Sequence, residues 1–503
     1  MVIDMKKHII SAWILSALVL SSALASCSDP ANTDAVTEAD PNQNDTAAAS
    51  VDTAELTELE KRMQTPDNLP EKDWEGREFR ILISDLFDSQ NEILVEEQNG
   101  EQCNDAIYTR NEKIESRFNV KIAMNLITNA DDHSVTKQFN QLVLAGDDAF
   151  EIAGYCDYLA YVPIAASSCY DWTEVPMVDL DQPWHNKPAN DGATVNEKLF
   201  AICSDISVTS LTFTYALFFN QRLCADYDIP KDTLYQMVWD GEWTIDRFIE
   251  LTRDIYVDSN GDGKADEGDL YGFAYKIVNP GDVWLTAFDQ PVMRYEDGEM
   301  KFSFMTEKTE SALSKLHDYH HNASGTYIYD DQYEEETTFA QGKLVFAPLR
   351  FYAAFNALRE MEDDYSILPF PKWDEKQEGY YTNADDKFHI FSAPKTISDP
   401  EFLGMIYEAL CAESYRRVYP AYYDTALKGK YSSDAETADM LDLIMAGRKF
   451  DFSFQFGEKL GNLPYLFRGL LDAKNPNIAS KWASAEKALN RYMEKFYEMY
   501  EDD

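Results

Sequence analysis

The sequence predicts an α/β fold in two lobes, and three observations support this prediction. First, residues 78–155 alternate short apolar runs with helical patterns in the order strand, helix, strand, helix, strand. This order is typical of a parallel sheet with right-handed crossovers. Second, residues 74–503 are too many for one ordinary core, so two lobes are expected. Third, no repeat period and no long apolar span follow the N-terminal segment, which argues against a solenoid or a membrane bundle.

The first lobe begins with alternating predicted strands and helices. Three short apolar runs predict strands: "EFRILIS" at 78–84, "VKIAMNLI" at 120–127 and "FEIAGY" at 150–155. Apolar residues at helical spacing predict helices at 105–118 and 134–146, the second ending at Gly146. No Gly-x-Gly-x-x-Gly opens the first helix, so a dinucleotide site is not supported.

Strands and helices are also expected along the rest of the chain. Further strands are predicted at 198–203, 214–220, 271–275, 342–349 and 365–371. Asp399 as N-cap and Pro400 at the first helical position begin a helix. A terminal helix over 480–500 would bury one face, formed by Trp482, Leu489, Tyr492, Phe496 and Tyr500.

The segment "DSNGDGKADEGD" at 258–269 has the spacing of a calcium-binding loop. Such a loop needs oxygen ligands at positions 1, 3, 5, 7, 9 and 12 and a glycine at position 6, here Gly263. The six ligand positions hold Asp258, Asn260, Asp262, Lys264 through its backbone carbonyl, Asp266 and Asp269. The alternative is a surface turn rich in Asp and Gly, because these residues dominate turns for backbone reasons. A helix capped by Thr244 precedes the loop and a strand follows it, so a bound Ca²⁺ would be structural.

The N-terminus predicts export and membrane anchoring. Residues 1–26 have Lys6, Lys7 and an apolar run that is too short to span a bilayer, as in a signal peptide. The tetrapeptide "LASC" resembles the bacterial lipobox, which implies that Cys27 carries diacylglycerol and anchors the chain. Residues 27–73 are poor in aromatic residues and predict a disordered tether.

Charge and cysteine content limit the partners. The formal net charge is −46, from 44 basic and 90 acidic residues, which excludes nucleic acid and anionic headgroups as partners. Six cysteines follow Cys27, an even number that permits disulfides without requiring them. Their pairing stays open.

Two other classes of protein, and one metal site, are alternatives. An exported hydrolase is possible because two acidic residues at the right separation suffice for glycoside hydrolysis, but no Gly-x-Ser-x-Gly or His-Glu-x-x-His motif is present. His317, His320 and His321 have helical spacing that suits zinc, although a solvated helix face is favoured. A glycan-binding surface lipoprotein built from helical repeats is the other alternative. The strand-helix-strand-helix-strand run at 78–155 and the absence of a repeat period argue against it.

Taken together, the ordered landmarks resemble the extracellular solute-binding proteins of bacterial ABC importers, family 1, of the sugar-binding lipoprotein type. The similarity spans nearly all of the chain after the tether. The matching stretches are "NDAIYTRNEKIESRFNVKI", "YALFFNQRLCADYDIP", "GEWTIDRFIELTRDI", "DSNGDGKADEGDLYGFAY", "TFAQGKLVFAP", "YSILPFPKWDEKQEGYYT" and "YYDTALKGKYSSDAETADMLDLI".

The resemblance implies a periplasmic-binding-protein-like fold with an interlobe hinge and a central cleft. Lobe 1 would comprise 74–213 and 345–394, and lobe 2 would comprise 214–344 and 395–503, with crossings at "TYALFFN" and near "GKLVFAPLRF". The implied function is capture of a small solute, a mono- or oligosaccharide, and its delivery to an ABC permease without catalysis. The protein would be a monomer, anchored through lipid on the extracellular face of a bacterial cell membrane.

Candidate ligand contacts follow strand ends and crossings, where receptors of this build bind solutes. Aromatic rings suit the apolar faces of sugars, and polar side chains suit their hydroxyl groups. The candidates are Tyr155, Asp157, Trp172, Trp184, Asp205, Trp284, Arg350 and Tyr352.

Overall fold

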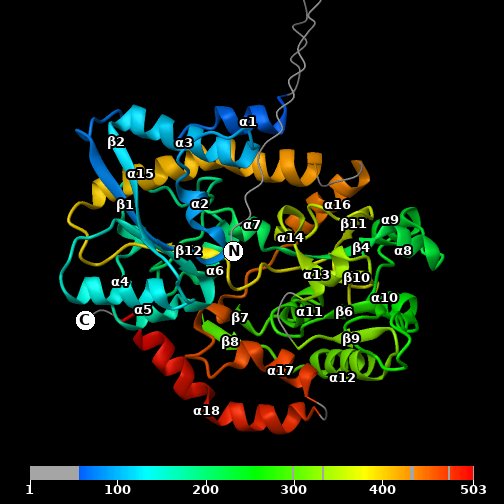
Figure 1. Ribbon diagram of the computed structural model, residues 1–503. Helices are drawn as coiled ribbons and strands as arrows, with labels where there is room; N and C mark the ends of the chain where they lie inside the picture. The colour runs from blue at the N-terminus through cyan, green and yellow to red at the C-terminus, as the bar shows by residue number, and fades with distance from the viewer. Residues whose placement is uncertain (1–55, 297–298, 331–333, 431–434, 474–475, 502–503) are drawn as a thin grey trace, which may run out of the picture. The chain divides into compact units, whose positions relative to one another are not determined.

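The computed structural model describes residues 56–296, 299–330, 334–430, 435–473 and 476–501. The expected signal peptide and Cys27 lie outside these residues. Two mixed sheets and one hairpin provide the strands, and helices pack around them (Figure 1). The α/β prediction is therefore confirmed.

The first sheet has four strands in the order β12-β3-β1-β2. Its strands are β1 (Arg77–Ser84), β2 (Val120–Ile127), β3 (Ile152–Cys156) and β12 (His389–Ser392). β1 pairs in parallel with β2 and with β3, while β12 runs antiparallel to β3. The predicted strand-helix-strand-helix-strand order of residues 78–155 is thus correct.

Helices from distant parts of the chain cover the first sheet. α3 (Gln102–Phe118) packs on α15 (Pro400–Glu413), and α4 (Ser134–Leu144) packs on β1 and β3 (Figure 1). The side chain of Asp399 accepts a hydrogen bond from the backbone N–H of Phe402, which confirms the predicted N-cap. α15 buries residues on all sides because it lies between the sheet and other helices.

The second sheet has six strands in the order β11-β4-β10-β6-β5, with β9 paired to β6. Its strands are β4 (Tyr215–Asn220), β5 (Tyr256–Val257), β6 (Leu270–Tyr275), β9 (Thr326–Ile328), β10 (Leu344–Arg350) and β11 (Tyr365–Leu368). β6 is parallel to β9 and β10, while β4 is antiparallel to β10 and β11. The two central strands β4 and β10 are buried along their whole length, as strands covered on both faces must be.

The remaining elements connect and cover the sheets. The strands β7 (Met293–Glu296) and β8 (Glu299–Phe302) form a hairpin. The other α-helices are α1 (Glu58–Gln64), α2 (Gln90–Ile93), α5 (Tyr161–Ala165), α6 (Lys187–Ala193), α7 (Thr209–Thr212), α8 (Gln221–Asp226), α9 (Lys231–Trp239), α10 (Ile245–Thr252), α11 (Val283–Ala287), α12 (Glu307–Asn322), α13 (Glu334–Ala340), α14 (Tyr352–Phe355), α16 (Ala435–Ala446), α17 (Leu466–Asp472) and α18 (Ile478–Glu498). Of the five residues predicted for the inner face of the terminal helix, only two are fully buried. These are Phe496 in α18 and Tyr500 just beyond its end.

Three sequence-based expectations disagree with the strand pairing. Residues 198–203 form no strand, because Ile202 makes only an isolated bridge to Phe391. β10 and β11, expected in lobe 1, pair with β4 of the second sheet. α15, expected in lobe 2, packs with α3 of the first sheet. Pairing over long sequence separations decides these placements, and local patterns do not contain that information.

Three chain segments run side by side where the chain passes between the sheets. Tyr215 donates its backbone N–H to the carbonyl of Asn383 at 3.1 Å, beside a bridge between Thr214 and Ala384. Thr382 in turn exchanges backbone hydrogen bonds with Gly447 and Lys449. The crossing segments are therefore 213–215, 382–385 and 447–449. The first overlaps the segment 214–220 predicted as a crossing, whereas the segment near 342–351, predicted as the return, belongs to β10 of the second sheet.

Residues 56–73 fold against the rest of the chain. The tether predicted at 27–73 is therefore too long at its C-terminal end. Thr57 and Glu60 form a reciprocal capping box that starts α1. The side chain of Arg416 donates to the carbonyl oxygen of Thr65 at 2.7 Å and approaches Asp67 at 3.2 Å. These contacts hold a polar segment that has no apolar core of its own.

The contact between α15 and the backbone of Pro176 yields a stability prediction. A Cβ added at Gly404 would lie 1.8 Å from the carbonyl oxygen of Pro176, whereas one added at Gly469 in α17 meets nothing within 4 Å. We expect Gly404→Ala to lower the free energy of unfolding by about 1–3 kcal/mol, because backbone must move. The matched Gly469→Ala should raise it by about 0.5–1 kcal/mol, through helix propensity. Urea unfolding measures both, and equal effects of the two changes would contradict the packing of α15.

Candidate functional site

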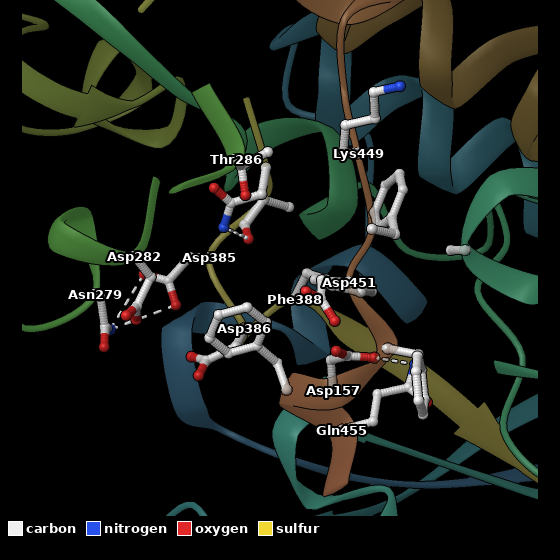
Figure 2. Close-up of a pocket in the computed structure, with 16 residues that line it drawn as sticks. Asp157, Asn279, Asp282, Thr286, Asp385, Asp386, Phe388, Lys449, Asp451 and Gln455 are labelled. Carbon is white, nitrogen blue, oxygen red and sulfur yellow. Dashed lines mark hydrogen bonds between the residues drawn. The ribbon is translucent and has the colours of Figure 1, made fainter. Parts of the chain in front are cut away.

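A cavity lies at the crossing segments and is lined by residues from both sheets' connections (Figure 2). The cavity volume is about 30 Å³, within about 560 Å³ of space between protein atoms that includes open solvent. Its polar lining residues are Asp157, Asn279, Asp282, Thr286, Asn383, Asp385, Asp386, Lys449, Asp451 and Gln455. Its aromatic lining residues are Phe388, Phe450, Phe452 and Phe454.

The cavity residues occupy strand ends, the positions from which open α/β sheets contact ligands. Asp157 follows β3 directly, and Phe388 precedes β12, the antiparallel neighbour of β3. Asn279 and Asp282 follow β6 of the second sheet. The carboxyl ends of a strand from each sheet therefore face one cavity, which is where open α/β sheets bind ligands.

The carboxylate of Asp385 is the most heavily bonded group in the cavity wall. It accepts hydrogen bonds from the hydroxyl of Tyr215 at 2.9 Å and from the side-chain amide of Asn279 at 3.3 Å. It also accepts the backbone N–H of Lys387 at 3.1 Å and lies 3.7 Å from Nη1 of Arg350. Asp385 is 1% exposed, so these partners replace water completely.

Of the other four carboxylates, Asp451 accepts backbone N–H groups of Val292 and Ser453 at its two oxygens, whereas the remaining three each keep one oxygen without a hydrogen-bond partner among the described residues. Asp157 accepts from Nε2 of Gln455 at 2.7 Å at one oxygen (Figure 2). Asp386 accepts from the hydroxyl of Tyr465 at 3.0 Å, also at one oxygen. Asp282 accepts from Nη1 of Arg468 at 2.5 Å through Oδ2, while its buried Oδ1 has no partner.

Burial and mutual repulsion raise the pKa values of these carboxyl groups. Burial, with a smaller contribution from Asp385, raises the pKa of Asp282 to about 7 despite the nearby Arg468. Burial also raises the pKa of Asp157 well above its usual range, and Asp386 adds to the shift. The pKa of Asp386 is raised by burial and then by Asp385. The cavity is therefore short of positive charge.

The only lysine among the cavity residues does not supply that charge. Lys449 is exposed, extends away from the carboxylates in Figure 2, and places Nζ 4.4 Å from the ring centroid of Tyr381. Beyond it the cavity continues into a wider groove that shares Thr286 and residues 449–452. That groove adds about 1960 Å³ of empty space open to solvent.

The structure places the three candidate tryptophans in the core. Trp172 donates its indole N–H to the carbonyl of Phe391 at 3.1 Å, and Trp184 donates to the carboxylate of Glu408 at 3.0 Å. Trp284 donates to the hydroxyl of Tyr275 at 3.1 Å. Each is at most 1% exposed, so in this structure none of the three rings reaches the cavity.

The other candidates divide between the cavity and its surroundings. Asp157 lines the cavity, and Arg350 contacts it through Asp385. Tyr155 is buried with its hydroxyl 2.6 Å from Oγ of Ser392. Tyr352 packs on Phe213, and burial raises the pKa of the half-buried Asp205 to about 7, away from the cavity.

The sequence-based argument missed Asn279, Asp282 and the two segments 383–386 and 449–455. Asn279 and Asp282 follow a correctly predicted strand, so the strand-end rule could have found them. The other two segments flank crossings that no local pattern marks. Their place in the cavity follows only from the pairing of 382–385 with 213–215 and 447–449.

The expected calcium loop connects β5 to the antiparallel β6, and not a helix directly to a strand. Its side chains accept backbone hydrogen bonds within the loop, for example Asp258 from Gly261 at 2.7 Å and from Gly263 at 2.9 Å. Within the described residues no three His, Cys, Asp or Glu side chains converge on one metal position. The donors are chemically suited to a hard cation, but their oxygens would have to turn inward to hold one.

The three histidines of α12 have other partners. Nε2 of His317 bonds to the carbonyl of Ala473, and Nε2 of His321 bonds to the carbonyl of Leu471, both at 2.8 Å. They thus cap the end of α17. His320 is buried against Tyr275, and burial lowers its pKa to about 3. This arrangement disagrees with the zinc hypothesis, and the favoured solvated face applies only to the exposed His321.

Comparisons with known proteins establish the fold. No protein-family model and no curated protein matches the chain. Among solved structures it is similar to an ABC transporter solute-binding protein from Thermotoga lettingae TMO, crystallised with α-D-tagatose. The TM-score is 0.54 at 11% sequence identity, and the similarity covers 83% of this chain and 100% of that chain. The protein therefore has the mixed α/β fold of a periplasmic solute-binding protein, which confirms the predicted fold class.

None of the described helices is both long enough and apolar enough to span a membrane.

The raised pKa of Asp157 yields a prediction about stability and pH. A carboxyl group whose pKa is higher in the folded than in the unfolded state binds its proton more tightly when folded. Its contribution to the free energy of unfolding is therefore lost as pH rises above its unfolded pKa, here 3.8. Asp157→Asn removes that titration and keeps an oxygen for Gln455. We expect its melting temperature to exceed that of the wild type by roughly 2 °C or more at pH 8 and to match it near pH 4.

Thermal melts of the solute-free protein across this pH range measure the difference. Asp240→Asn, at an exposed position outside the cavity, is the matched control and should change neither melt. A lower melting temperature for Asp157→Asn at pH 8 would show that the ionised carboxylate stabilises the cavity.

Proposed function

We propose that the chain is the solute-binding receptor of a bacterial ABC importer and captures a carbohydrate in the cavity at the crossing segments. The observation that carries the proposal is the convergence of Asp157 and Asp282, from strand ends of the two sheets, on one cavity. The similar Thermotoga lettingae protein binds a sugar, which supports a carbohydrate as the solute class. An anchor at Cys27 would keep the receptor close to its permease.

The proposed lobes follow the strand pairing. Lobe 1 comprises 56–213 and 384–418, and lobe 2 comprises 214–383 and 419–501. Hinge rotation at the lobe boundaries 213–215 and 382–385, beside which residues 447–449 run, would close the lobes on the solute. Closure would let a transporter distinguish loaded from empty receptor. Four phenylalanines supply apolar faces for sugar rings, and Asn383, Thr286 and Gln455 supply groups for hydroxyls.

A carbohydrate hydrolase is the second candidate, favoured by one observation. The cavity holds a carboxyl group with a raised pKa near other carboxylates, which is the requirement for acid catalysis at a glycosidic bond. Asp385 is a poor nucleophile in such a pair, because three hydrogen-bond donors hold it and the Arg350 guanidinium lies beside it. Direct measurement of turnover separates the two functions.

Titration calorimetry of the full-length chain against mono- and oligosaccharides tests the receptor function. We expect one site with a dissociation constant in the micromolar range or tighter, and unchanged solute after incubation. Small-angle scattering should show a smaller radius of gyration when the solute is bound. Released product at catalytic rates would support the hydrolase, and binding without any change in scattering would contradict closure.

We also propose that the loop at 258–269 binds structural calcium, because its six oxygen donors and Gly263 have the required spacing. Ca²⁺ at 100 times its dissociation constant would stabilise the folded state by about 2.7 kcal/mol. We therefore expect the melting temperature to fall when a chelator replaces excess Ca²⁺. Asp262→Asn should lower this dependence, and Asp240→Asn should preserve it. Equal melts of the wild type in chelator and in calcium would contradict the assignment.

A further inference from the structure

The cavity is too small for a whole sugar unit in the arrangement that the structure shows. Its volume is about 30 Å³. On this measure roughly 10–15 Å³ is needed for one water molecule, so the cavity has room for about two waters. A pyranose ring with its hydroxyl groups is several times larger than that. Only one small substituent of a sugar, such as a hydroxymethyl group, therefore enters the cavity, and the proposed solute site extends beyond it.

The cavity wall has acceptors for such a substituent. Asp282 and Asn383 line the cavity, and Oδ1 of each is buried without a hydrogen-bond partner among the described residues. A buried acceptor without a donor is costly. A hydroxyl group carries one donor and can bond to either oxygen. A neutral sugar chain supplies such groups at its ends, so no charge on the solute is required.

The groove beside the cavity has the space that the cavity lacks. Measured in the same way, its volume is about 940 Å³. The two are continuous, because Thr286 and residues 449–452 line both. Pockets that enclose a small ligand measure about 300–1,000 Å³, so the groove is at the large end of that range. One sugar unit would leave most of the groove filled with water, and further units would displace that water from the apolar part of its lining.

Both proposed lobes line the groove. Lobe 1 contributes α6 and the turn after it, and lobe 2 contributes the end of α11 and the β7–β8 hairpin. Residues 448–452 lie next to both of these parts. A Cβ added at Gly192 in α6 would be 3.7 Å from the carbonyl oxygen of Phe450. On the other side, the backbone N–H of Val292 donates to the carboxylate of Asp451 at 2.8 Å. A solute that lies along residues 448–452 therefore contacts both lobes.

We propose that the receptor selects its solute by length and binds a linear oligosaccharide, with one substituent of the terminal unit in the cavity and the further units along the groove. The cavity and the groove meet at Phe450, which lines both and is half-buried. Its ring offers an apolar face to a sugar unit at this junction. This inference rests on the proposed receptor function and specifies the solute of the same site.

Titration calorimetry of the full-length chain measures the length dependence. The probes are cello-, manno-, xylo- and malto-oligosaccharides, each from the monosaccharide to the hexasaccharide. In a series that binds, we expect the dissociation constant to fall at least tenfold between the monosaccharide and the trisaccharide, because the added units fill the groove. The dissociation constant should then level off when the groove is full.

Gly192 allows the groove to be blocked without moving the backbone. A Cβ there makes only ordinary contacts, at 3.7 Å with the carbonyl oxygen of Phe450 and at 3.9 Å with Cβ of Phe452. We expect Gly192→Trp to weaken binding of the tightest oligosaccharide at least tenfold and Gly192→Ala to weaken it less than threefold. Gly469→Trp is the matched control and should leave binding unchanged, because Gly469 is exposed and meets nothing within 4 Å.

A second variant removes the ring at the junction. Phe450→Ala should weaken binding of the same oligosaccharide about tenfold. Trp239→Ala removes a ring that is 53% exposed on α9, outside the cavity and the groove, and should change binding less than twofold. The melting temperature of each variant establishes that it is folded.

The outcomes separate this inference from the receptor function. A monosaccharide that binds as tightly as its own oligomers overturns the length selection and leaves the receptor function intact. Wild-type affinity in folded Gly192→Trp and Phe450→Ala overturns the groove as the place of the further units. No binding of any compound overturns this inference together with the carbohydrate receptor function.

Discussion

The buried carboxylate of Asp385 is the interaction on which the cavity depends. It joins Tyr215 at the start of β4, Arg350 at the end of β10 and Asn279 in the loop after β6. These groups come from separate parts of the chain and meet at the crossing segment that contains Asp385 itself. Loss of a charged partner from such a cluster is expensive because an uncompensated buried charge remains. The cluster therefore fixes the crossing and the β6 loop in one relative position.

The same cluster explains why the cavity is electrostatically unbalanced. Arg350 and Arg468 hold Asp385 and Asp282 in place, and both guanidinium groups have further carboxylates beside them. The two guanidinium groups thus hold Asp385 and Asp282 in position, and they neutralise Asp157 and Asp386 less. In a region of low dielectric, such an imbalance interacts strongly with any charged group that enters the cavity. The same residues therefore fix the crossing segments and set the charge of the cavity.

The sequence predicts what is local and misses what depends on distant pairing. Apolar runs such as 78–84 and 120–127 become strands because their residues suit no other environment, and Asp399 caps α15 as its neighbours indicate. Asp157 is found because it follows a strand that any pattern would identify. Trp172 and Trp184 show the opposite case, since an indole suits a sugar ring or a core equally well. Their partners, Phe391 and Glu408, lie more than two hundred residues away, so only the fold decides.

Under the proposed receptor function, the crossing segments would also connect solute binding to closure. Backbone hydrogen bonds join 382–385 to 213–215 and to 447–449, while side chains from the same three segments or their flanks line the cavity. A rotation at these segments changes the separation between Asp157, after β3, and Asp282, after β6. A solute that contacts both sides has a higher affinity for the closed arrangement, and only such a difference in affinity shifts the equilibrium. A solute held by one side alone binds without closing the receptor, so the position of its polar groups matters as much as its affinity.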